Sequence, residues 1–225
     1  MSDIRIIETQ DGSHSLFVPA LNETYHSFHG ALQEAEYVFI KMGLHRWCSS
    51  YGNSLKIVEV GFGTGLNALL TLRESLQRKI QIEYTTIEAY PVNPDLLKKL
   101  NYKDKIELVD IGIWFDRLHE AKWNEKVDLS KDFVLHKIKG ELKECKLSKN
   151  YFDLVYYDAF APSKQADMWD YELLDKVAGT IAERGIFTTY CATGQLKRDL
   201  KTIGLEVETL PGPPGKKEMV RATKP

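Results

Sequence analysis

Residues 56–67 read Lys56-Ile57-Val58-Glu59-Val60-Gly61-Phe62-Gly63-Thr64-Gly65-Leu66-Asn67. A short apolar run ends in three glycines at alternate positions, and a helical pattern of leucines follows up to Leu76. This order predicts a strand, a tight turn and a helix, the opening unit of a nucleotide-binding α/β domain. Glycines suit the turn because the backbone bends sharply there and a ligand approaches it closely.

The spacing of the glycines distinguishes two kinds of nucleotide-binding loop. A dinucleotide-binding loop reads G-x-G-x-x-G, whereas this one reads G-x-G-x-G, with Glu59 two residues before the first glycine. The variant resembles the first motif of class I S-adenosylmethionine (AdoMet) methyltransferases. A lone glycine loop is a weak signal that a purely structural turn explains equally well, so the rest of the chain has to decide.

The bulk composition limits the class of protein. The 225 residues suffice for a single α/β domain, which we expect to span residues 1–225. We find no apolar run of about 18 residues and no signal-peptide pattern at the N-terminus, so we expect a cytoplasmic protein without a membrane span. Three scattered cysteines form neither a zinc pattern nor a disulfide framework. The net charge of −2 gives no evidence for nucleic acid, although a local basic patch remains compatible with it.

The N-terminal 30 residues are expected to form an appendage to the main domain. Residues 4–9 and 15–18 flank Asp11-Gly12, which predicts a small β-hairpin. A polar, aromatic loop over residues 19–30 then precedes a predicted helix at 31–45, and we expect this loop to cover a cleft. It contains His26 and His29, but no third ligand with suitable spacing is near, so no metal site is predicted.

Two acidic residues are expected beside the glycine loop. Glu88 ends a predicted strand over residues 82–88 and follows Gly65 by 23 residues, close to the distance of about 20 at which an acid binds ribose hydroxyls. Glu141 follows a predicted third strand at 132–138 and could accept from an adenine amino group. Each also has a plain reading, as a solvated loop acid for Glu88 and a surface acid for Glu141.

A third acid follows another buried strand. Residues 151–158 form an apolar run that ends at Asp158, and Pro162 then stops further pairing. Because the open cleft of a doubly wound sheet lies outside the carboxyl ends of its strands, Glu88, Glu141 and Asp158 should converge beside the glycine loop. This convergence predicts a site for AdoMet.

The remainder of the chain fits the same architecture. We predict a helix from Tyr171 to Glu183, a break at Arg184-Gly185 and a strand over Ile186–Cys191. A further helix ends at Gly204, and a C-terminal hairpin pairs 205–210 with 218–222. The predicted fold is thus an α/β class I AdoMet-dependent methyltransferase (Rossmann-like) doubly wound sheet with a C-terminal antiparallel hairpin and a small N-terminal β-hairpin.

The predicted site suits methyl transfer to an amine. The reaction is an in-line displacement that mainly requires alignment, and an amine that is protonated at neutral pH needs a base or an acceptor nearby. Asp158 could act as that base or could only orient the amine. Phe160 and the loop around Tyr25 would supply apolar walls.

Several motifs together resemble a narrower family, the methyltransferase of the bacterial MnmC/MnmD proteins. The motifs run from about residue 20 to 220 and are Glu23-Thr24-Tyr25-His26-Ser27, Glu59 to Asn67, Asp158-Ala159-Phe160-Ala161-Pro162 with Asp167-Met168-Trp169, and Gly215-Lys216-Lys217-Glu218-Met219. The resemblance implies methylation of the 5-aminomethyl group of a wobble (2-thio)uridine in tRNA. It also implies that a chain ending at Pro225 is the stand-alone form, without the FAD-dependent oxidase, so we expect neither FAD nor a metal.

The resemblance also implies roles for individual residues. The expected cofactor-binding residues are Glu59, Gly61, Gly63, Gly65, Asn67, Glu88, Glu141 and Asp158. The expected substrate-binding residues, beside the catalytic Asp158, are Tyr25, His26, Ser27, Phe160, Pro162, Trp169, Lys216 and Lys217. The turn after Asp158 carries Ala159 where many relatives have glycine, and the C-terminal loop carries Pro213-Pro214, which leaves the conformation of that loop open.

Basic residues gather in the last thirty positions, where they would meet tRNA phosphates near the anticodon. They are Lys197, Arg198, Lys201, Lys216, Lys217, Arg221 and Lys224. A solvated helix and tail explain them equally well without the family resemblance.

A wobble base must leave its stack to react, and Trp169 and Tyr25 are candidates to hold it. No obligate protein partner is evident. The alternatives are an AdoMet-dependent N-methyltransferase of a small amine or protein, and a non-catalytic nucleotide- or RNA-binding scaffold.

Overall fold

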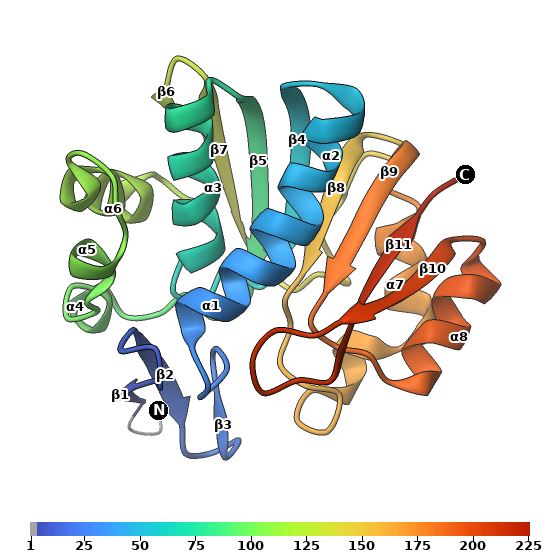
Figure 1. The fold of residues 1–225 in the computed structure, drawn as a ribbon, viewed down its shortest axis with the longest axis horizontal. Helices are drawn as coiled ribbons and strands as arrows, with labels where there is room; N and C mark the ends of the chain where they lie inside the picture. The colour runs from blue at the N-terminus through green and yellow to red at the C-terminus, as the bar shows by residue number, and fades with distance from the viewer. Residues whose placement is uncertain (1–3) are drawn as a thin grey trace.

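An eight-stranded sheet runs through the centre of the protein, whose computed structural model describes residues 4–225 (Figure 1). The strand order is β10-β11-β9-β8-β4-β5-β7-β6, and β4, β5, β7, β8 and β9 are mutually parallel. The strands are β4 (Ser54–Val60), β5 (Gln81–Glu88), β6 (Lys126–Ser130), β7 (Phe133–Lys139), β8 (Phe152–Tyr157), β9 (Ile181–Thr189), β10 (Glu206–Pro211) and β11 (Glu218–Thr223). The antiparallel β11 lies between β9 and β10, which confirms the predicted C-terminal hairpin.

Strands β4 and β8 lie side by side in the middle of the sheet and define where a ligand can bind. Their side chains are buried on both faces, as the near-continuous apolar runs of a parallel sheet require. After β4 the chain adds β5 and β7 on one side, and it later adds β8 and β9 on the other. The carboxyl ends of β4 and β8 therefore flank a topological switch point, where α/β sheets bind their ligands.

Helices cover both faces of the sheet (Figure 1). On one face lie α3 (Leu66–Arg78) and a continuous helical segment formed by α1 (Ala31–Ala35), the π-helical η1 (Glu36–His45) and α2 (Arg46–Tyr51). On the other face lie α7 (Tyr171–Ala178) and α8 (Gly194–Ile203). The short helices α4 (Pro94–Leu97) and α5 (Tyr102–Lys105) and the longer α6 (Ile111–Glu120) link β5 to β6.

A small antiparallel sheet precedes the main domain. It consists of β1 (Arg5–Glu8), β2 (His14–Val18) and β3 (Glu23–Thr24), in that order, which confirms the predicted hairpin; residues 1–3 of the expected appendage lie outside the described residues. Asp11 in its turn accepts hydrogen bonds from Ser13 N at 2.9 Å and from Gln33 N at 3.0 Å, which ties the hairpin to the start of α1. Leu16 is fully buried in the main core. The hairpin thus packs on the domain and holds the following loop in place.

Three sequence-based boundaries are wrong. The helical segment predicted at 31–45 continues to Tyr51. In addition to these boundaries, the edge strand β6 was not predicted. The helix predicted to Glu183 ends at Ala178, and β9 begins already at Ile181 and contains Arg184-Gly185 within it. Pairing of Ile181 with Phe152 on β8 overrides the local helical pattern, and Gly179 follows the last helical residue as glycines commonly do.

Membrane insertion receives no support from the helices. Within residues 4–225, none of them combines the length and the apolar character that crossing a bilayer requires.

Candidate active site

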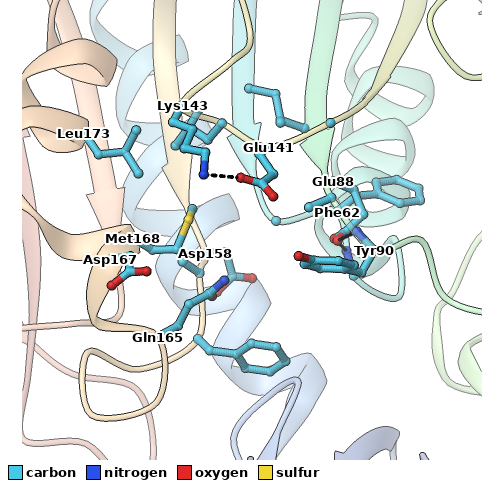
Figure 2. A pocket seen from close by; sticks show the side chains of 18 of the residues that line it. Phe62, Glu88, Tyr90, Glu141, Lys143, Asp158, Gln165, Asp167, Met168 and Leu173 are labelled. Carbon is cyan, nitrogen blue, oxygen red and sulfur yellow. Dashed lines mark hydrogen bonds and ion pairs between the residues drawn. The ribbon is translucent and has the colours of Figure 1, made fainter. Parts of the chain in front are cut away.

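A cavity of about 740 Å³ opens at the carboxyl ends of the central strands. Residues that directly follow β4, β5, β7 and β8 line it, together with the segment between β8 and α7. Its volume lies in the range of about 300–1,000 Å³ that small-molecule and cofactor sites occupy. Figure 2 shows Glu88 and Tyr90 on one side, Met168 and Leu173 on the other, and Asp158 between them.

The glycine loop forms the floor of the cavity, where its backbone leaves no room for side chains. Gly61 has a φ of +92°, and a Cβ atom on it would lie 2.6 Å from the carbonyl oxygen of Asp158. Gly63 has a φ of +52°, and its Cβ position lies 3.0 Å from the ring of Tyr25. Gly65 precedes α3 and does not line the cavity. Gly61 and Gly63 are thus required by the packing of the loop against Asp158 and Tyr25, and the close approach of a ligand to the loop stays a prediction.

Both carboxylate oxygens of Glu88 accept a hydrogen bond from a backbone N–H group. Its Oε2 accepts from Gly63 N at 2.9 Å, and its Oε1 accepts from Tyr90 N at 2.8 Å. Each carboxylate oxygen has a further lone pair, and the side chain lines the cavity. This fixed acceptor, next to the glycine loop, suits the hydroxyl groups of a ribose.

Glu141 lies on the same side of the sheet as Glu88, as expected. The hydrogen bond from Gly140 N to Glu88 O, at 3.0 Å, brings the two segments together. The Glu141 carboxylate pairs with Lys143 Nζ at 2.7 Å (Figure 2), and both side chains line the cavity. The ion pair is largely exposed, so a ligand can displace Lys143 at little cost.

Asp158 follows β8 and contacts the glycine loop. Its backbone N–H donates to Val60 O at 3.0 Å, and its Oδ2 accepts from Asn67 Nδ2 at 2.8 Å. Burial, reinforced by the negative charge of Glu34, raises the pKa of the Asp158 carboxyl to about 7, while the Asn67 hydrogen bond opposes the rise. A carboxyl whose pKa lies near the working pH is suited to accept a proton.

The walls near Asp158 are aromatic. Tyr25 and Phe160 contact each other edge to face, with ring centroids 5.1 Å apart, and both line the cavity. His26 also lines it, and burial lowers the pKa of this imidazole to about 4, so that the ring is neutral at pH 7. Tyr25, His26 and Phe160 thus line the same cavity as Asp158, and their role in binding the substrate stays a prediction.

Three other predicted substrate residues lie away from the cavity lining. Ser27 uses its backbone N–H to donate to Glu34 Oε1 at 3.1 Å, and Pro162 follows the cavity wall without joining it. Trp169 is only 8% exposed and donates from Nε1 to Phe160 O at 2.7 Å. A direct stacking role for Trp169 is wrong, because its ring packs between Tyr157 and Tyr190 and supports the Phe160 loop from behind.

The two lysines of the C-terminal loop have different surroundings. Lys216 forms an ion pair with the buried Glu34 on α1, and its Nζ lies 4.1 Å from the centroid of the Tyr190 ring. Its ammonium group is engaged with Glu34 and does not line the cavity, so its role as a substrate-binding residue stays a prediction. Lys217 is exposed and does not line the cavity.

Glu59 also departs from its predicted role. The side chain is completely buried in β4 and does not line the cavity. Asn67, in contrast, lines the cavity at the start of α3. A direct contact between Glu59 and a cofactor is therefore not supported, whereas the remaining cofactor residues other than Gly65 border the cavity.

Sequence reasoning missed part of the cavity wall. Tyr90 is 74% exposed beside Glu88, and Met168 and Leu173 form an apolar surface opposite it. The position of Tyr90, two residues after a strand-end acid, was a usable signal. Met168 belongs to the quoted Asp167-Met168-Trp169 motif, of which only Trp169 was selected, and Leu173 lies on α7, where a leucine does not distinguish a cavity wall from the core.

Metal binding has no visible site in the described chain. Residues 4–225 contain no group of three or more His, Cys, Asp or Glu side chains placed to hold a metal ion. A metal-free reaction stays a prediction.

The fold and the site define the class of protein, since the switch-point cavity, the glycine loop and the inserted antiparallel β11 are the features of a class I AdoMet-dependent methyltransferase. The crystal structure of MNMC2 from Aquifex aeolicus has the same fold, with a TM-score of 0.79 over 100% of this chain and 72% of that one, at 23% identity. A family described as S-adenosyl-L-methionine-dependent methyltransferase matches residues 110–225. The chain belongs to this family.

Curated relatives carry a more specific name. The tRNA 5-methylaminomethyl-2-thiouridine biosynthesis bifunctional protein MnmC of Pseudoalteromonas atlantica is 33% identical over 214 residues, which cover 87% of this chain and 30% of that protein. The protein of the same name from Burkholderia multivorans is 29% identical over 224 residues, or 92% of this chain and 33% of that protein. The predicted resemblance to the MnmC methyltransferase is confirmed. The chain spans about a third of the length of these relatives.

The volume of the cavity, the glycine loop beneath it and the polar groups that line it fit AdoMet. Gly61 and Gly63, which line the cavity, would lie against the amino-acid part, Glu88 would accept from the ribose hydroxyls, and Glu141 would accept from an adenine amino group. Bound AdoMet supplies an electrophilic methyl group on a sulfonium sulfur.

Proposed function

We propose that this chain methylates the amine of 5-aminomethyl-(2-thio)uridine at the wobble position of tRNA, giving 5-methylaminomethyl-(2-thio)uridine. The observation that carries the proposal is Asp158, a carboxyl with a pKa of about 7 between the glycine loop and two aromatic rings. The names of the relatives that align with 87–92% of this chain support the choice of substrate.

The chemistry follows from the state of the substrate amine. A primary alkylammonium ion has no free lone pair, so it must lose one proton before nitrogen can form a bond to the methyl carbon. Asp158 accepts that proton directly or through water, while its second oxygen stays hydrogen-bonded to Asn67. As the nitrogen–carbon bond forms, the carbon–sulfur bond of the sulfonium breaks, and the product leaves as a secondary ammonium ion.

The aromatic pair positions the base. Tyr25 and Phe160 offer flat apolar surfaces on which a uracil ring released from its stack can pack. Tyr25 remains a neutral phenol, because burial and the nearby Glu88 raise its pKa to about 12. A neutral wall of this kind is apolar and adds no charge beside the amine.

We infer that exposed basic residues near the C-terminus meet the phosphates of the anticodon arm. Several of the candidate cations are engaged: Lys197 pairs with Glu218 at 2.6 Å, and Arg221 pairs with Glu208 at 2.8 Å. Lys201 and Lys217 are exposed, and they remain candidates for phosphate contacts. We further propose that the reaction occurs in the cytoplasm and uses neither FAD nor a metal.

The test compares four acceptors with labelled AdoMet. They are tRNA carrying 5-aminomethyluridine, the same tRNA without the modification, the free nucleoside, and a simple alkylamine. We expect label only in the modified tRNA, recovered as 5-methylaminomethyluridine after nucleoside analysis. Equal transfer to the free nucleoside or the alkylamine would move the assignment to a small-amine methyltransferase. Cofactor binding without transfer to any acceptor would contradict the proposal.

A further inference from the structure

The carboxyl of Glu59 lies in a buried polar cluster behind Asp158. Glu59 pairs with Thr86 of β5 on one side and with Tyr156 of β8 on the other, so these three side chains share one face of the sheet. Tyr84 lies on the same face two residues before Thr86. Asn67 projects from α3, which covers this face, and lies next to the Glu59 carboxyl.

Five buried oxygens of this cluster have no hydrogen-bond partner within the described chain. They are both carboxyl oxygens of Glu59, Asn67 Oδ1, Tyr84 OH and Thr86 Oγ1. The side chains lie close to one another, but they do not reach hydrogen-bond geometry. Because each unmade bond of a buried polar group costs about 1–3 kcal/mol, the cluster is expected to satisfy itself through small side-chain movements or internal water.

The protonation state of Glu59 decides how the cluster can be satisfied. Burial, together with the charge of Asp158, raises the pKa of the Glu59 carboxyl to about 8, while neighbouring hydrogen-bonding groups oppose the rise. At pH 7 the group is therefore mostly a neutral acid with one O–H donor and one carbonyl acceptor. The hydroxyls of Tyr84 and Thr86 can donate to the carbonyl oxygen. The Glu59 O–H can then donate to the oxygen of Asn67, the nearby acceptor that lacks a partner.

The last hydrogen bond of this series, from Asn67 to Asp158, is present in the structure. Asn67 Nδ2 donates to Asp158 Oδ2 at 2.8 Å. An amide has its oxygen and nitrogen on opposite sides, so a donor at the oxygen fixes the direction of the N–H groups. A neutral acid at Glu59 would thus orient Asn67 toward Asp158, whereas an ionised Glu59 would repel the Asn67 oxygen and attract its nitrogen instead.

We propose that Glu59 is a positioning residue for methyl transfer, which in its protonated form holds the Asn67 amide so that its N–H points at Asp158. The inference rests on the proposed role of Asp158 as the group that receives the substrate amine. It assigns Glu59 a task behind the cavity in place of a direct contact with the cofactor.

Ionisation of Glu59 should weaken this arrangement. The titratable groups that face it are Tyr84 of β5, Tyr156 of β8 and Asp158 at the end of β8. Burial raises the pKa of both tyrosines further above the usual value, so they stay neutral. Above a pH of about 8, loss of the Glu59 proton removes the donor to Asn67 and adds a negative charge beside Asp158.

The decisive variants are Glu59→Gln and Glu59→Leu. Glutamine has the size of the neutral acid, keeps one acceptor and one donor site, and cannot ionise, whereas leucine removes the polar contact to Asn67. We expect Glu59→Leu to raise the pH at which the Asp158 carboxyl is half titrated. Carbon-13 NMR of labelled aspartate carboxyls measures this midpoint. Glu59→Leu should also lower kcat by about tenfold or more, with the dissociation constant for AdoMet within about twofold of wild type. Glu59→Gln should restore both the midpoint and kcat at pH 7.

The pH profile separates positioning from a merely structural role. Above a pH of about 8, the wild type should lose kcat, and Glu59→Gln should keep it. Superimposable profiles of the two proteins would overturn the proposal, even if Glu59→Leu fails to fold. A drop of about tenfold or more in AdoMet affinity for Glu59→Gln would instead assign Glu59 to the cofactor's ammonium group. The NMR titration needs no substrate. It therefore tests the role of Glu59 even if the proposed tRNA substrate is not methylated.

Discussion

Asn67 joins the two halves of the site through one hydrogen bond, from its Nδ2 to Asp158 Oδ2 at 2.8 Å. Asn67 lies in the first turn of the helix that follows the glycine loop, and Asp158 follows a strand 91 residues further along the chain. The group that we propose to receive the amine is thereby aligned with the loop that we propose to hold the cofactor.

Replacing Asn67 with leucine should impair catalysis more than folding. The Asp158 carboxylate would lose its observed side-chain donor, and hydrogen bonds to charged groups contribute about 1.5–3 kcal/mol. We expect kcat to fall by about 10- to 100-fold and the pKa of Asp158 to rise. Steady-state kinetics across pH measures both effects. An unchanged acidic limb would show that the hydrogen bond does not act on Asp158.

Gly61→Ala should disrupt the junction between β4 and β8. An added Cβ atom would lie 2.6 Å from the Asp158 carbonyl oxygen, in addition to the strain of a φ of +92°. Gly52→Ala is a matched control, since its φ is +103° and nothing lies within 4 Å of its Cβ position. We expect both variants to lose about 1 kcal/mol of stability from backbone strain, Gly61→Ala to lose more because of the clash with the Asp158 carbonyl oxygen, and Gly61→Ala to lose AdoMet affinity as well. Calorimetry with and without AdoMet distinguishes them, and equal affinities would contradict the close approach.

The adjacent lysines of the C-terminal loop should respond differently to substitution. Lys216→Met leaves the buried carboxylate of Glu34 without its partner, so we expect a loss of about 1–3 kcal/mol in the free energy of unfolding. It should also raise the pKa of Asp158, since the positive charge of Lys216 lowers it. Urea unfolding and the pH profile measure these changes.

Lys217→Met is the matched control for Lys216→Met. Because Lys217 is exposed, stability should stay within about 0.5 kcal/mol of wild type. If Lys217 contacts a phosphate, the slope of log affinity for tRNA against log salt should decrease by about 1. The reverse pattern, with Lys216 governing the salt slope and Lys217 governing stability, would contradict the assignment of the two lysines.

Two buried carboxyls should each contribute a loss of stability as the pH rises from about 4 to 8, whereas the lowered pKa of His26 contributes in the opposite direction below a pH of about 6.5. Burial raises the pKa of Asp158 from 3.8 to about 7 and that of Glu59 from 4.5 to about 8. Over this window the unfolded chain releases protons that the folded chain retains, so the unfolded state becomes relatively more favourable. Glu59→Gln removes one of these contributions and should flatten the dependence. Urea unfolding at several pH values checks it, and equally steep curves would show that Glu59 is not buried as an acid.

Ligand sites of parallel α/β sheets lie at the carboxyl ends of the strands, and this explains what the sequence could predict about the site. Glu88, Glu141 and Asp158 each follow an apolar strand, and parallel strands bring such residues to one edge. The ion pair between Lys216 and Glu34 joins positions 182 residues apart, and no local pattern reports such a contact. Trp169 belongs to a motif that pointed to substrate, yet its burial depends on packing against Tyr157.

The wrong helix boundary has a similar cause. Val177, Ala178, Ile181 and Ala182 repeat at helical spacing, which favours a helix as far as residue 183 when the segment is viewed alone. In the folded protein Ile181 already pairs with β8. Tertiary pairing therefore decided the boundary, while the strongly patterned unit from Lys56 to Leu76 was predicted correctly.

The most direct test compares wild type with Asp158→Asn in methyl transfer to tRNA carrying 5-aminomethyluridine, over a pH range of about 5 to 9. Asparagine keeps the shape of the side chain but cannot take a proton. We predict an acidic limb near pH 7 for the wild type, and for Asp158→Asn a loss of kcat of about 100-fold or more without that limb. AdoMet binding should be retained. A variant that methylates the tRNA at the wild-type rate with the same limb would contradict the central role of Asp158.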